Sequence, residues 1–164
     1  MADPFKWSSP LGVSTVLFLV IGAMWLAIGA LTVPLLERGS EAHIIFVSER
    51  TDTAHFGDAP SRLLGSNSAL AKYRTMMLTV VAGFLLLAGT MFVLVSWFGL
   101  RNGSRWALAA LCAGGLLATA LWVVALVPYY RAGIKITLAD APPFIWLPAI
   151  LIVPATVLGW VGLR

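Results

Sequence analysis

The fold is decided by residues 75–130, which read TMMLTVVAGFLLLAGTMFVLVSWFGL-RNGSR-WALAALCAGGLLATALWVVALVPYY. Two stretches without Asp, Glu, Lys or Arg, 26 and 25 residues long, flank a five-residue segment that contains two arginines. A helix rises about 1.5 Å per residue, so about 20 apolar residues cross a bilayer core of about 30 Å. Each stretch is long enough to span a membrane, and the short connection predicts a tight antiparallel hairpin.

Two further charge-free stretches, residues 7–36 and 141–163, are 30 and 23 residues long. All 18 charged residues therefore fall in 60 of the 164 positions. A soluble domain is about 25% charged, whereas this chain is 11% charged. The net charge is +4. This distribution of charge excludes a soluble enzyme, a disordered chain and a nucleic-acid binder, and it predicts an integral membrane protein.

The spanning segments are expected to be helices, because only helices and closed barrels satisfy backbone hydrogen bonds within lipid. Barrel strands alternate in polarity over about ten residues, and runs such as Val81–Ala88 do not alternate. The apolar run 11–36 is longer than the core of about 7–15 residues in a signal peptide, so we expect it to stay in the membrane. We predict an all-α protein, a four-transmembrane-helix bundle forming a single domain over residues 1–164, with spans at about 11–36, 75–100, 106–130 and 142–163.

The three connections differ in length: loop 1 is residues 37–74, loop 2 is residues 101–105 and loop 3 is residues 131–140. Loop 1 alone is long enough to carry a folded extramembrane element. Near its end, Ser66 or Ser68 is expected to cap a helix that begins before the membrane.

Segments of loops 1 and 3 have the pattern of strands. Residues 133–138, GIKITL, alternate apolar and polar side chains, and residues 43–49, HIIFVSE, are rich in β-branched types. Pairing between them predicts a short β-sheet that caps the bundle.

Membrane orientation rests on the loop charges. The side with the termini and loop 2 has four cationic residues: Lys6, Arg101, Arg105 and Arg164. The other side has seven, so the count of positive residues alone favours loops 1 and 3 inside. Acidic residues neutralise loop 1, however, whereas loop 2 has two arginines in five residues. We therefore expect a bacterial-type plasma membrane with the termini and loop 2 cytoplasmic and loops 1 and 3 outside.

The motif W-x-G-L-R occurs at residues 97–101 and again at 160–164, and a Val-Pro pair ends the first and third spans. One interpretation is two tandem copies of a helix hairpin. The alternative is coincidence, because Trp, Gly and Arg are common where a helix leaves a membrane.

Three spans have small residues spaced four apart, which lets helices approach closely in lipid. These faces are Ala23-Ala27, Ala110-Gly114-Ala118 and Ala155-Gly159. Packing within the bundle is the simpler interpretation. The alternative is contact with a membrane-protein partner or a second copy of the chain, in addition to the surrounding lipid bilayer.

Several chemistries are excluded by what the spans lack. No span contains a carboxylate, amine or imidazole, which proton-coupled transporters, pumps and small multidrug exporters need at membrane depth. Both histidines are in loop 1, so no span can ligate a haem. Cys112 is the only cysteine, which excludes a dithiol enzyme and indicates a packing role. We expect no cofactor.

Loop 1 contains the only cluster with ligand chemistry, namely Glu41, His43, Asp52, His55 and Asp58. Such groups bind metals or act as acid and base, and Glu41, His43 and His55 are the catalytic candidates. The spacing matches no compact metal motif, so we predict no metal site. Ordinary solvated loop polarity explains the same residues.

An aromatic set near the outer ends of the third and fourth spans is the candidate ligand site. It consists of Trp122, Tyr129, Tyr130, Phe144 and Trp146, with Arg131 beside it. Aromatic walls with one cation suit a lipid headgroup or amphiphile. The alternative is anchoring at the membrane interface, which uses the same residue types.

The arrangement of four spans, a long first outer loop, a shorter second outer loop and an expected outer sheet is similar in outline to claudin-type proteins. Loop 1 lacks the W-G-L-W signature and the two cysteines of that family, since it has neither Trp nor Cys. The resemblance therefore implies an architecture and no function.

Two functions remain open. The featureless spans favour a non-enzymatic accessory or scaffolding subunit of a membrane complex. The alternative is a membrane-embedded enzyme or binding protein for a lipid or isoprenoid-like amphiphile.

Overall fold

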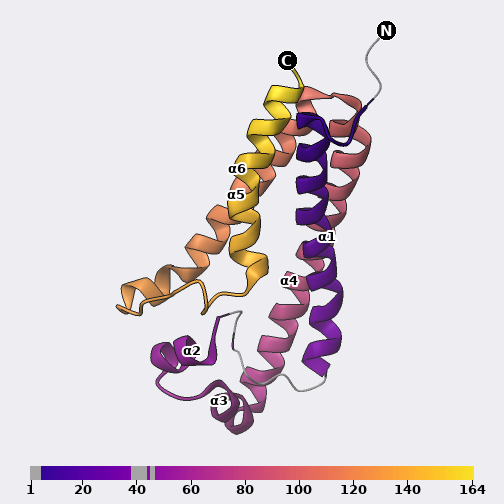
Figure 1. The fold of residues 1–164 in the computed structure, drawn as a ribbon. Coiled ribbons are helices and arrows are strands. Elements are labelled where there is room, and N and C mark those ends of the chain that lie inside the picture. Colours follow the sequence, from indigo (N-terminus) through magenta and orange to yellow (C-terminus); the bar gives the residue numbers. More distant parts are fainter. Residues whose placement is uncertain (1–4, 38–43, 45–46) are drawn as a thin grey trace.

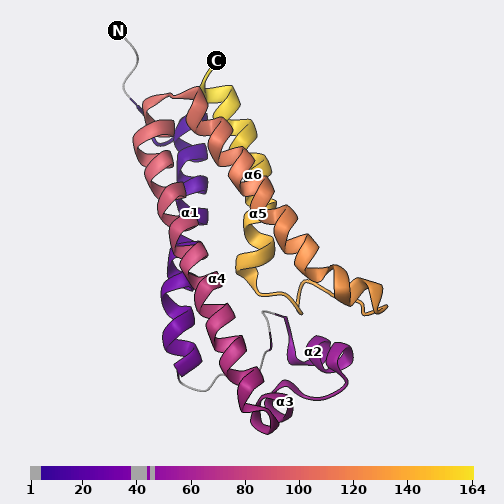
Figure 2. The same ribbon diagram turned by 180° about the vertical axis from the view of Figure 1, so that it is seen from behind.

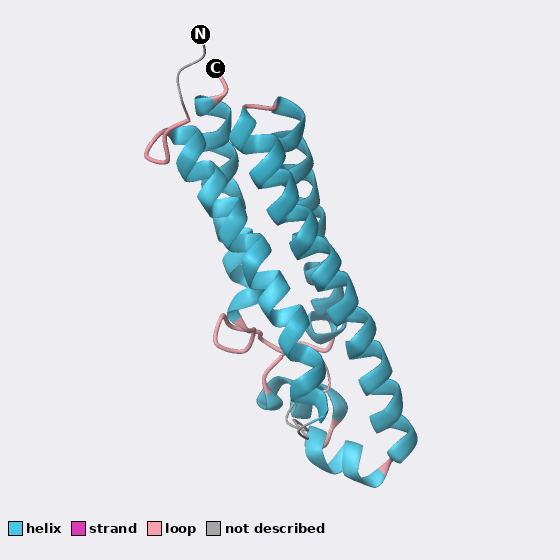
Figure 3. Cartoon of the chain, turned by 90° about the vertical axis from the view of Figure 1, so that its right-hand side faces the viewer, coloured by secondary structure: helices cyan, strands magenta, loops and turns pink. Residues whose placement is uncertain are grey.

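The computed structural model describes residues 5–37, 44 and 47–164, and within them every regular element is a helix (Figure 3). Four helices are long and apolar enough to cross a membrane, as the charge-free stretches predict. The elements are α1 (Pro10–Glu37), α2 (Glu49–Phe56), α3 (Pro60–Ser66), α4 (Ser68–Leu94), the π-helical turn η1 (Val95–Gly99), the 3₁₀ turn η2 (Leu100–Asn102), α5 (Arg105–Arg131) and α6 (Pro143–Gly162).

Helix α4 begins seven residues before the charge-free stretch, so its first turns project from the apolar segment by about 10 Å. The predicted capping residues were wrong by one position. Asn67 is the N-cap, and its side-chain oxygen accepts a hydrogen bond of 3.0 Å from the Leu70 amide. Ser66 is instead the last residue of α3, and Ser68 is the first of α4.

The hairpin between α4 and α5 is tight, as the five-residue loop predicts. A π-helical turn at η1 is followed by the short turn η2, and Gly103 takes a left-handed conformation with φ of 78°. A Cβ on Gly99 would lie 2.7 Å from the Ala107 Cβ, so only glycine allows the two helices to meet here.

The helices pack as two hairpins that meet through α1 and α6. Helix α1 packs against α4 and α6, and α5 packs against α6. Away from their shared turn, α4 and α5 diverge, so that α1 and α4 form one arm and α5 and α6 the other (Figures 1 and 2). The buried core lies near the closed end, around Phe18, Ile21, Leu111 and Ile152.

A close helix contact joins α1 to α4 through glycines that the sequence analysis did not single out. A Cβ on Gly89 would lie 2.7 Å from the Gly22 carbonyl oxygen, and a Cβ on Gly29 would lie 2.9 Å from the Ala82 carbonyl oxygen. Helices in lipid gain stability from such close packing. We call this interface the α1–α4 glycine contact.

The three predicted small-residue faces lie in different environments. Ala155 and Gly159 are buried, and a Cβ on Gly159 would lie 2.7 Å from the Ser14 hydroxyl. Ala23 and Ala27 are exposed on the outside of α1. The face of Ala110-Gly114-Ala118 lines an open groove, described below.

The predicted cap sheet is not present in the described residues. Residues 134–137 are irregular, and Ser48 ends the other expected strand because it is the N-cap of α2 and accepts from the Thr51 amide. Glu49 and Asp52 in the first turn then favour the helix through its dipole. Loops 1 and 3 do meet, but through side chains and one backbone hydrogen bond of 2.8 Å from the Ser48 amide to the Asp140 carbonyl.

Candidate functional site

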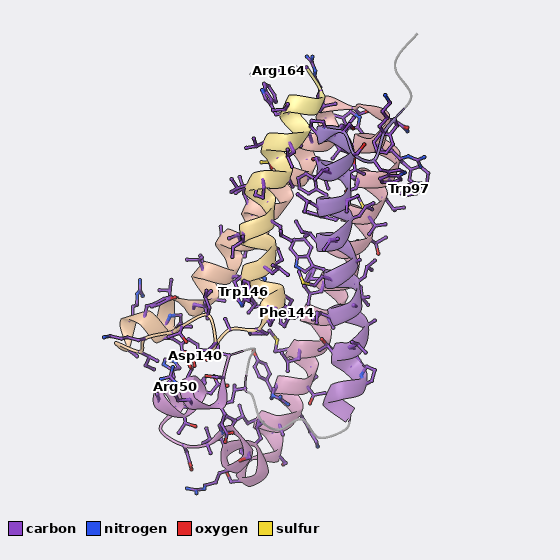
Figure 4. The ribbon with its side chains drawn as sticks, viewed as in Figure 1. Arg50, Trp97, Asp140, Phe144, Trp146 and Arg164 are labelled. Carbon is purple, nitrogen blue, oxygen red and sulfur yellow. The ribbon has the colours of Figure 1, made fainter. Side chains whose placement is uncertain are left out.

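Asp140 joins loop 1 to loop 3 beneath the open end of the bundle, where Figure 4 shows it beside Arg50. The Ser48 hydroxyl donates to Asp140 Oδ1 at 2.7 Å, and Arg50 Nη2 donates to Oδ2 at 2.6 Å. The amide and hydroxyl of Thr137 donate to the same Oδ2, at 2.9 and 2.7 Å. The Asp140 carboxylate therefore connects Ser48 and Arg50, on the loop 1 side, with Thr137 of loop 3.

These donors fix the charge state of Asp140. The Ser48 hydroxyl has the largest effect, followed by the Thr137 amide and then Arg50, and together they hold the pKa of Asp140 well below its usual range. Each donor stabilises the ionised form, and the opposing effect of burial is smaller. Asp140 is thus an anchoring carboxylate and not a proton acceptor near neutral pH.

Asp52 and Tyr129 form a second, fully buried link between loop 1 and α5. Their exposed fractions are 0% and 2%. The Tyr129 hydroxyl donates to Asp52 Oδ1 at 2.7 Å, and the Ile44 amide donates to Oδ2 at 2.8 Å. Buried polar groups require such partners, so this pair positions α2 against the end of α5.

His55 lies against the same tyrosine. Its ring centroid is 4.4 Å from that of Tyr129 and 4.8 Å from that of Phe56, and its buried Nδ1 has no hydrogen-bond partner among the described residues. The other catalytic candidates, Glu41 and His43, lie outside the described residues. No group of three His, Cys, Asp or Glu side chains that could hold a metal is found in the described part of the chain.

The remaining members of the loop 1 cluster do not converge on His55. Asp58 accepts from the Ala59 amide at 2.8 Å and pairs with Arg62 at 3.1 Å, one turn along α3. Asp52 is committed to Tyr129. Asp52 and Asp58, the described acids of this cluster, are therefore engaged in anchoring and local contacts.

The predicted aromatic set is distributed over several environments. We call α2, α3 and the described parts of loops 1 and 3 the cap. Tyr129 is buried against the cap, whereas Tyr130 and Arg131 are exposed. Trp146 donates from its indole to the Ala141 carbonyl at 3.2 Å. Trp122 contacts Phe144 edge to face, with ring centroids 6.1 Å apart, and lines a cavity.

That cavity is a groove of about 750 Å³ between α4 and α5, which we call the α4–α5 groove. Its walls run from Val81 to Phe92 on α4 and from Ala110 to Ala125 on α5, and Trp25 of α1 also lines it. Wall residues such as Phe84 and Leu121, 65% and 61% exposed, show that the groove opens sideways from the bundle. Among the described residues, no ionisable side chain lines it.

Trp25 is a buried polar group of this groove. It is 3% exposed and packs edge to face on Phe92 with ring centroids 4.8 Å apart, but its indole N–H has no acceptor among the described residues. A buried donor without an acceptor costs roughly 1–3 kcal/mol. The contribution of Trp25 to stability therefore comes from the packing of its ring.

Sequence reasoning identified part of this region and missed the rest. The i, i+4 spacing marked Ala110, Gly114 and Ala118, and all three line the groove. The opposite wall on α4 is built from ordinary large apolar residues that no pattern distinguishes. Asp140 was missed as well, and the one available signal was that it is the only acid in loop 3.

The chain matches no protein-family model, no curated protein and no solved structure.

Proposed function

We propose that the chain is a non-enzymatic accessory or scaffolding subunit of a membrane complex, and that its α4–α5 groove receives a transmembrane helix of a partner protein. The observation that carries the proposal is the divergence of α4 and α5, which leaves an apolar, laterally open groove of about 750 Å³ in the membrane-spanning part of the molecule.

The dimensions of the groove suit a helix. From Ala110 to Ala125 the α5 wall covers about 22 Å, or roughly two thirds of a bilayer core. Large side chains such as Phe84 and Leu87 form the α4 wall, whereas Ala110, Gly114 and Ala118 form a low surface on α5. A helix laid along the small residues can bring its backbone close to α5 while its side chains contact the α4 wall.

The chemistry of the groove favours a non-catalytic role. A catalytic site needs an acid, base, nucleophile or metal within reach of its substrate. The described lining is apolar, and the carboxylates of Asp52 and Asp140 are engaged in anchoring loop 1. Packing is the interaction that this surface offers.

We propose a bacterial-type plasma membrane as the location, with the termini and loop 2 in the cytoplasm. We also propose that the chain consists of two tandem copies of a helix hairpin. This interpretation is supported by the two W-x-G-L-R copies, in which the Arg101 guanidinium lies 4.5 Å from the Trp97 ring centroid and that of Arg164 lies 5.8 Å from the Trp160 ring centroid.

Photo-crosslinking in native membranes tests the occupant. A benzophenone amino acid is introduced at Leu121, in the groove, and in a second protein at Val123, which is 56% exposed and points away from the groove. The expected result is an adduct with a membrane protein at position 121 only, mapped to a transmembrane helix of that protein. Equal adducts at both positions would contradict the proposal.

A matched pair of substitutions completes the test. Ala118→Leu adds volume to the groove, and Ala120→Leu adds the same volume to an exposed position two residues along α5. Ala118→Leu should abolish the adduct at position 121, and Ala120→Leu should leave it unchanged. Identical effects of the two substitutions would refute the groove as the docking surface.

The alternative function, binding of a lipid or isoprenoid-like amphiphile, is favoured by the groove volume, which falls in the range of about 300–1,000 Å³ typical of ligand pockets. The same experiment distinguishes it. An adduct with lipid at position 121, lost in Ala118→Leu, supports the alternative and rejects the partner helix. An adduct between two copies of this chain rejects both in favour of self-association.

A further inference from the structure

A second cavity lies on the other side of α5, at the end of the molecule that carries the termini. It is a slot of about 290 Å³ between α5 and α6, and we call it the α5–α6 slot. Cys112 and Thr156 line its interior, and Arg105 and Arg164 line it at the helix ends. Its lining residues are not shared with the α4–α5 groove.

Two guanidinium groups stand at the mouth of the slot. Arg105 is the first residue of α5, and its Nη2 lies 3.4 Å from the Leu163 carbonyl, so it reaches across to the end of α6. The Arg164 guanidinium lies 5.8 Å from the centroid of the Trp160 ring, which also lines the slot. Both side chains are exposed, and neither is paired with a carboxylate in the described part of the chain.

The surrounding surface is cationic. Lys6, Arg101, Arg105 and Arg164 all lie at this end, where Figure 4 shows Arg164 and Trp97. Among residues 47–164, every Asp and Glu belongs to the cap at the opposite end. A cationic membrane-facing surface attracts anionic lipids. The charge at the mouth is therefore complementary to a phosphate group at the membrane surface.

The interior of the slot has polar and apolar groups that suit the ester region of a phospholipid, just below its headgroup. Thr156 lies about 12 Å along α6 from Arg164. Its hydroxyl is buried without a hydrogen-bond partner among the described residues, whereas Thr15, Thr32, Thr90 and Thr119 each donate to the carbonyl four residues earlier. An ester carbonyl entering the slot would give this hydroxyl an acceptor.

From these observations we propose that the α5–α6 slot binds one anionic phospholipid. The phosphate lies between Arg105 and Arg164, and the upper part of one acyl chain enters beside Cys112 and Thr156. The slot is too small for a whole lipid, so the rest of the molecule remains in the bilayer. This site is independent of a partner helix in the groove.

Lipid binding to the purified full-length chain is measured by native mass spectrometry, with phosphatidylglycerol and phosphatidylcholine of identical acyl chains. Phosphatidylglycerol should bind more tightly. The double variant Arg105→Gln/Arg164→Gln should lose about fivefold in phosphatidylglycerol affinity for each arginine. The control Lys6→Gln/Arg101→Gln removes the same charge from the same end and should change the affinity much less. Equal binding of the two lipids, or equal loss in the two double variants, would overturn the proposal.

The single thiol reports whether a chain enters the slot. Alkylation of Cys112 by a membrane-permeable maleimide should slow when phosphatidylglycerol is added, and should not slow in the Arg105→Gln/Arg164→Gln variant. The single variant Arg164→Gln, which keeps the Arg105 contact to Leu163, repeats the measurement with less disturbance of the helix ends. Unchanged alkylation with bound lipid would refute the assignment to this slot. Full competition by millimolar inorganic phosphate would also refute it, because it would indicate an ion site without an acyl chain.

Discussion

The α1–α4 glycine contact makes opposite predictions for two glycines of the same helix. In Gly89→Ala the new methyl group would lie 2.7 Å from both the Gly22 carbonyl oxygen and the Leu26 amide nitrogen. Both neighbours are backbone atoms, so no side chain can rotate away and the helices must move apart. In Gly83→Ala the methyl group has no atom within 4 Å.

The magnitudes follow from two competing terms. Overpacking a close contact costs about 1–3 kcal/mol, while replacing glycine by alanine inside a helix gains up to about 1 kcal/mol. Gly89→Ala should therefore lower the free energy of unfolding by up to about 2 kcal/mol. Gly83→Ala should raise it by up to about 1 kcal/mol, because only the propensity term applies.

Equilibrium unfolding in mixed micelles, followed by helical ellipticity as the fraction of denaturing detergent rises, measures both changes. The two variants differ by one methyl group at positions six residues apart, so their difference reports the local environment and not the detergent. If both variants proved equally stable, or if Gly89→Ala were the more stable, α1 and α4 would not approach each other at this distance.

Three further predictions concern the cap and the groove. Tyr129→Phe leaves Asp52 buried with the Ile44 amide as its remaining donor, and it should weaken the docking of α2 by about 1.5–3 kcal/mol. Faster hydrogen exchange in α2 would show this loss. The control Tyr130→Phe, at an exposed site, should have no effect. The pKa of Asp140 is depressed in the folded chain, so its contribution to the docking of loop 1 is fully present above the unfolded-state pKa of about 3.9 and is lost as the pH falls below that value. Rate-corrected hydrogen exchange around Ser48 should therefore accelerate on acidification in the parent chain and be fast at every pH in Asp140→Asn. A parent profile that does not change with pH would contradict this. Trp25→Phe removes an unpaired buried N–H and keeps the contact with Phe92, so it should cost less than about 1 kcal/mol in the same unfolding assay. Trp25→Ala should cost about 3–5 kcal/mol. If the two variants lost similar amounts of stability, the indole N–H would have an acceptor.

The number and position of the spanning helices were predictable because a single physical constraint determines them. A charge-free run of more than 20 residues has no stable alternative to a helix in lipid. The residue at which a helix begins depends on small free-energy differences between neighbouring capping residues. Here Asn67 is the N-cap of α4, and it lies between Ser66 and Ser68, which the sequence favoured.

The β-sheet prediction failed because alternation is a local pattern, whereas a strand needs a partner edge. Residues 134–137 alternate but have no described strand to pair with, and on the loop 1 side Ser48 begins a helix. The contacts that hold loop 1 in place link residues 77 and 92 positions apart, namely Asp52 with Tyr129 of α5 and Ser48 with Asp140 of loop 3. Asp52 was assigned to a polar cluster and Tyr129 to an aromatic set, and no sequence pattern relates one to the other.

Small-residue spacing identified candidate faces but not their partners. In helices rich in Ala and Gly, an i, i+4 pair occurs on several faces, so spacing alone does not distinguish a face toward a neighbour from a face toward lipid. Ala155 and Gly159 are buried, Ala23 and Ala27 are exposed, and the α1–α4 glycine contact uses Gly22 and Gly89 instead.

Helix α5 is the element on which the two proposed sites can be separated. It has the smallest buried share of the four spans, 11% of its most apolar window against 28–33% for the others. Ala110 lines the groove and Cys112 lines the slot, and a separation of two residues corresponds to about 200° around a helix. The two sites therefore lie on opposite sides of α5.

If these sides act independently, each substitution should affect one assay only. Ala118→Leu should abolish the crosslink at position 121 and leave the lipid protection of Cys112 intact, and Arg105→Gln/Arg164→Gln should do the reverse. Loss of both signals in either variant would mean that α5 moves as a rigid unit between the groove and the slot. Lipid binding would then be coupled to the docking of the partner helix, and the two occupants would stabilise the same position of α5.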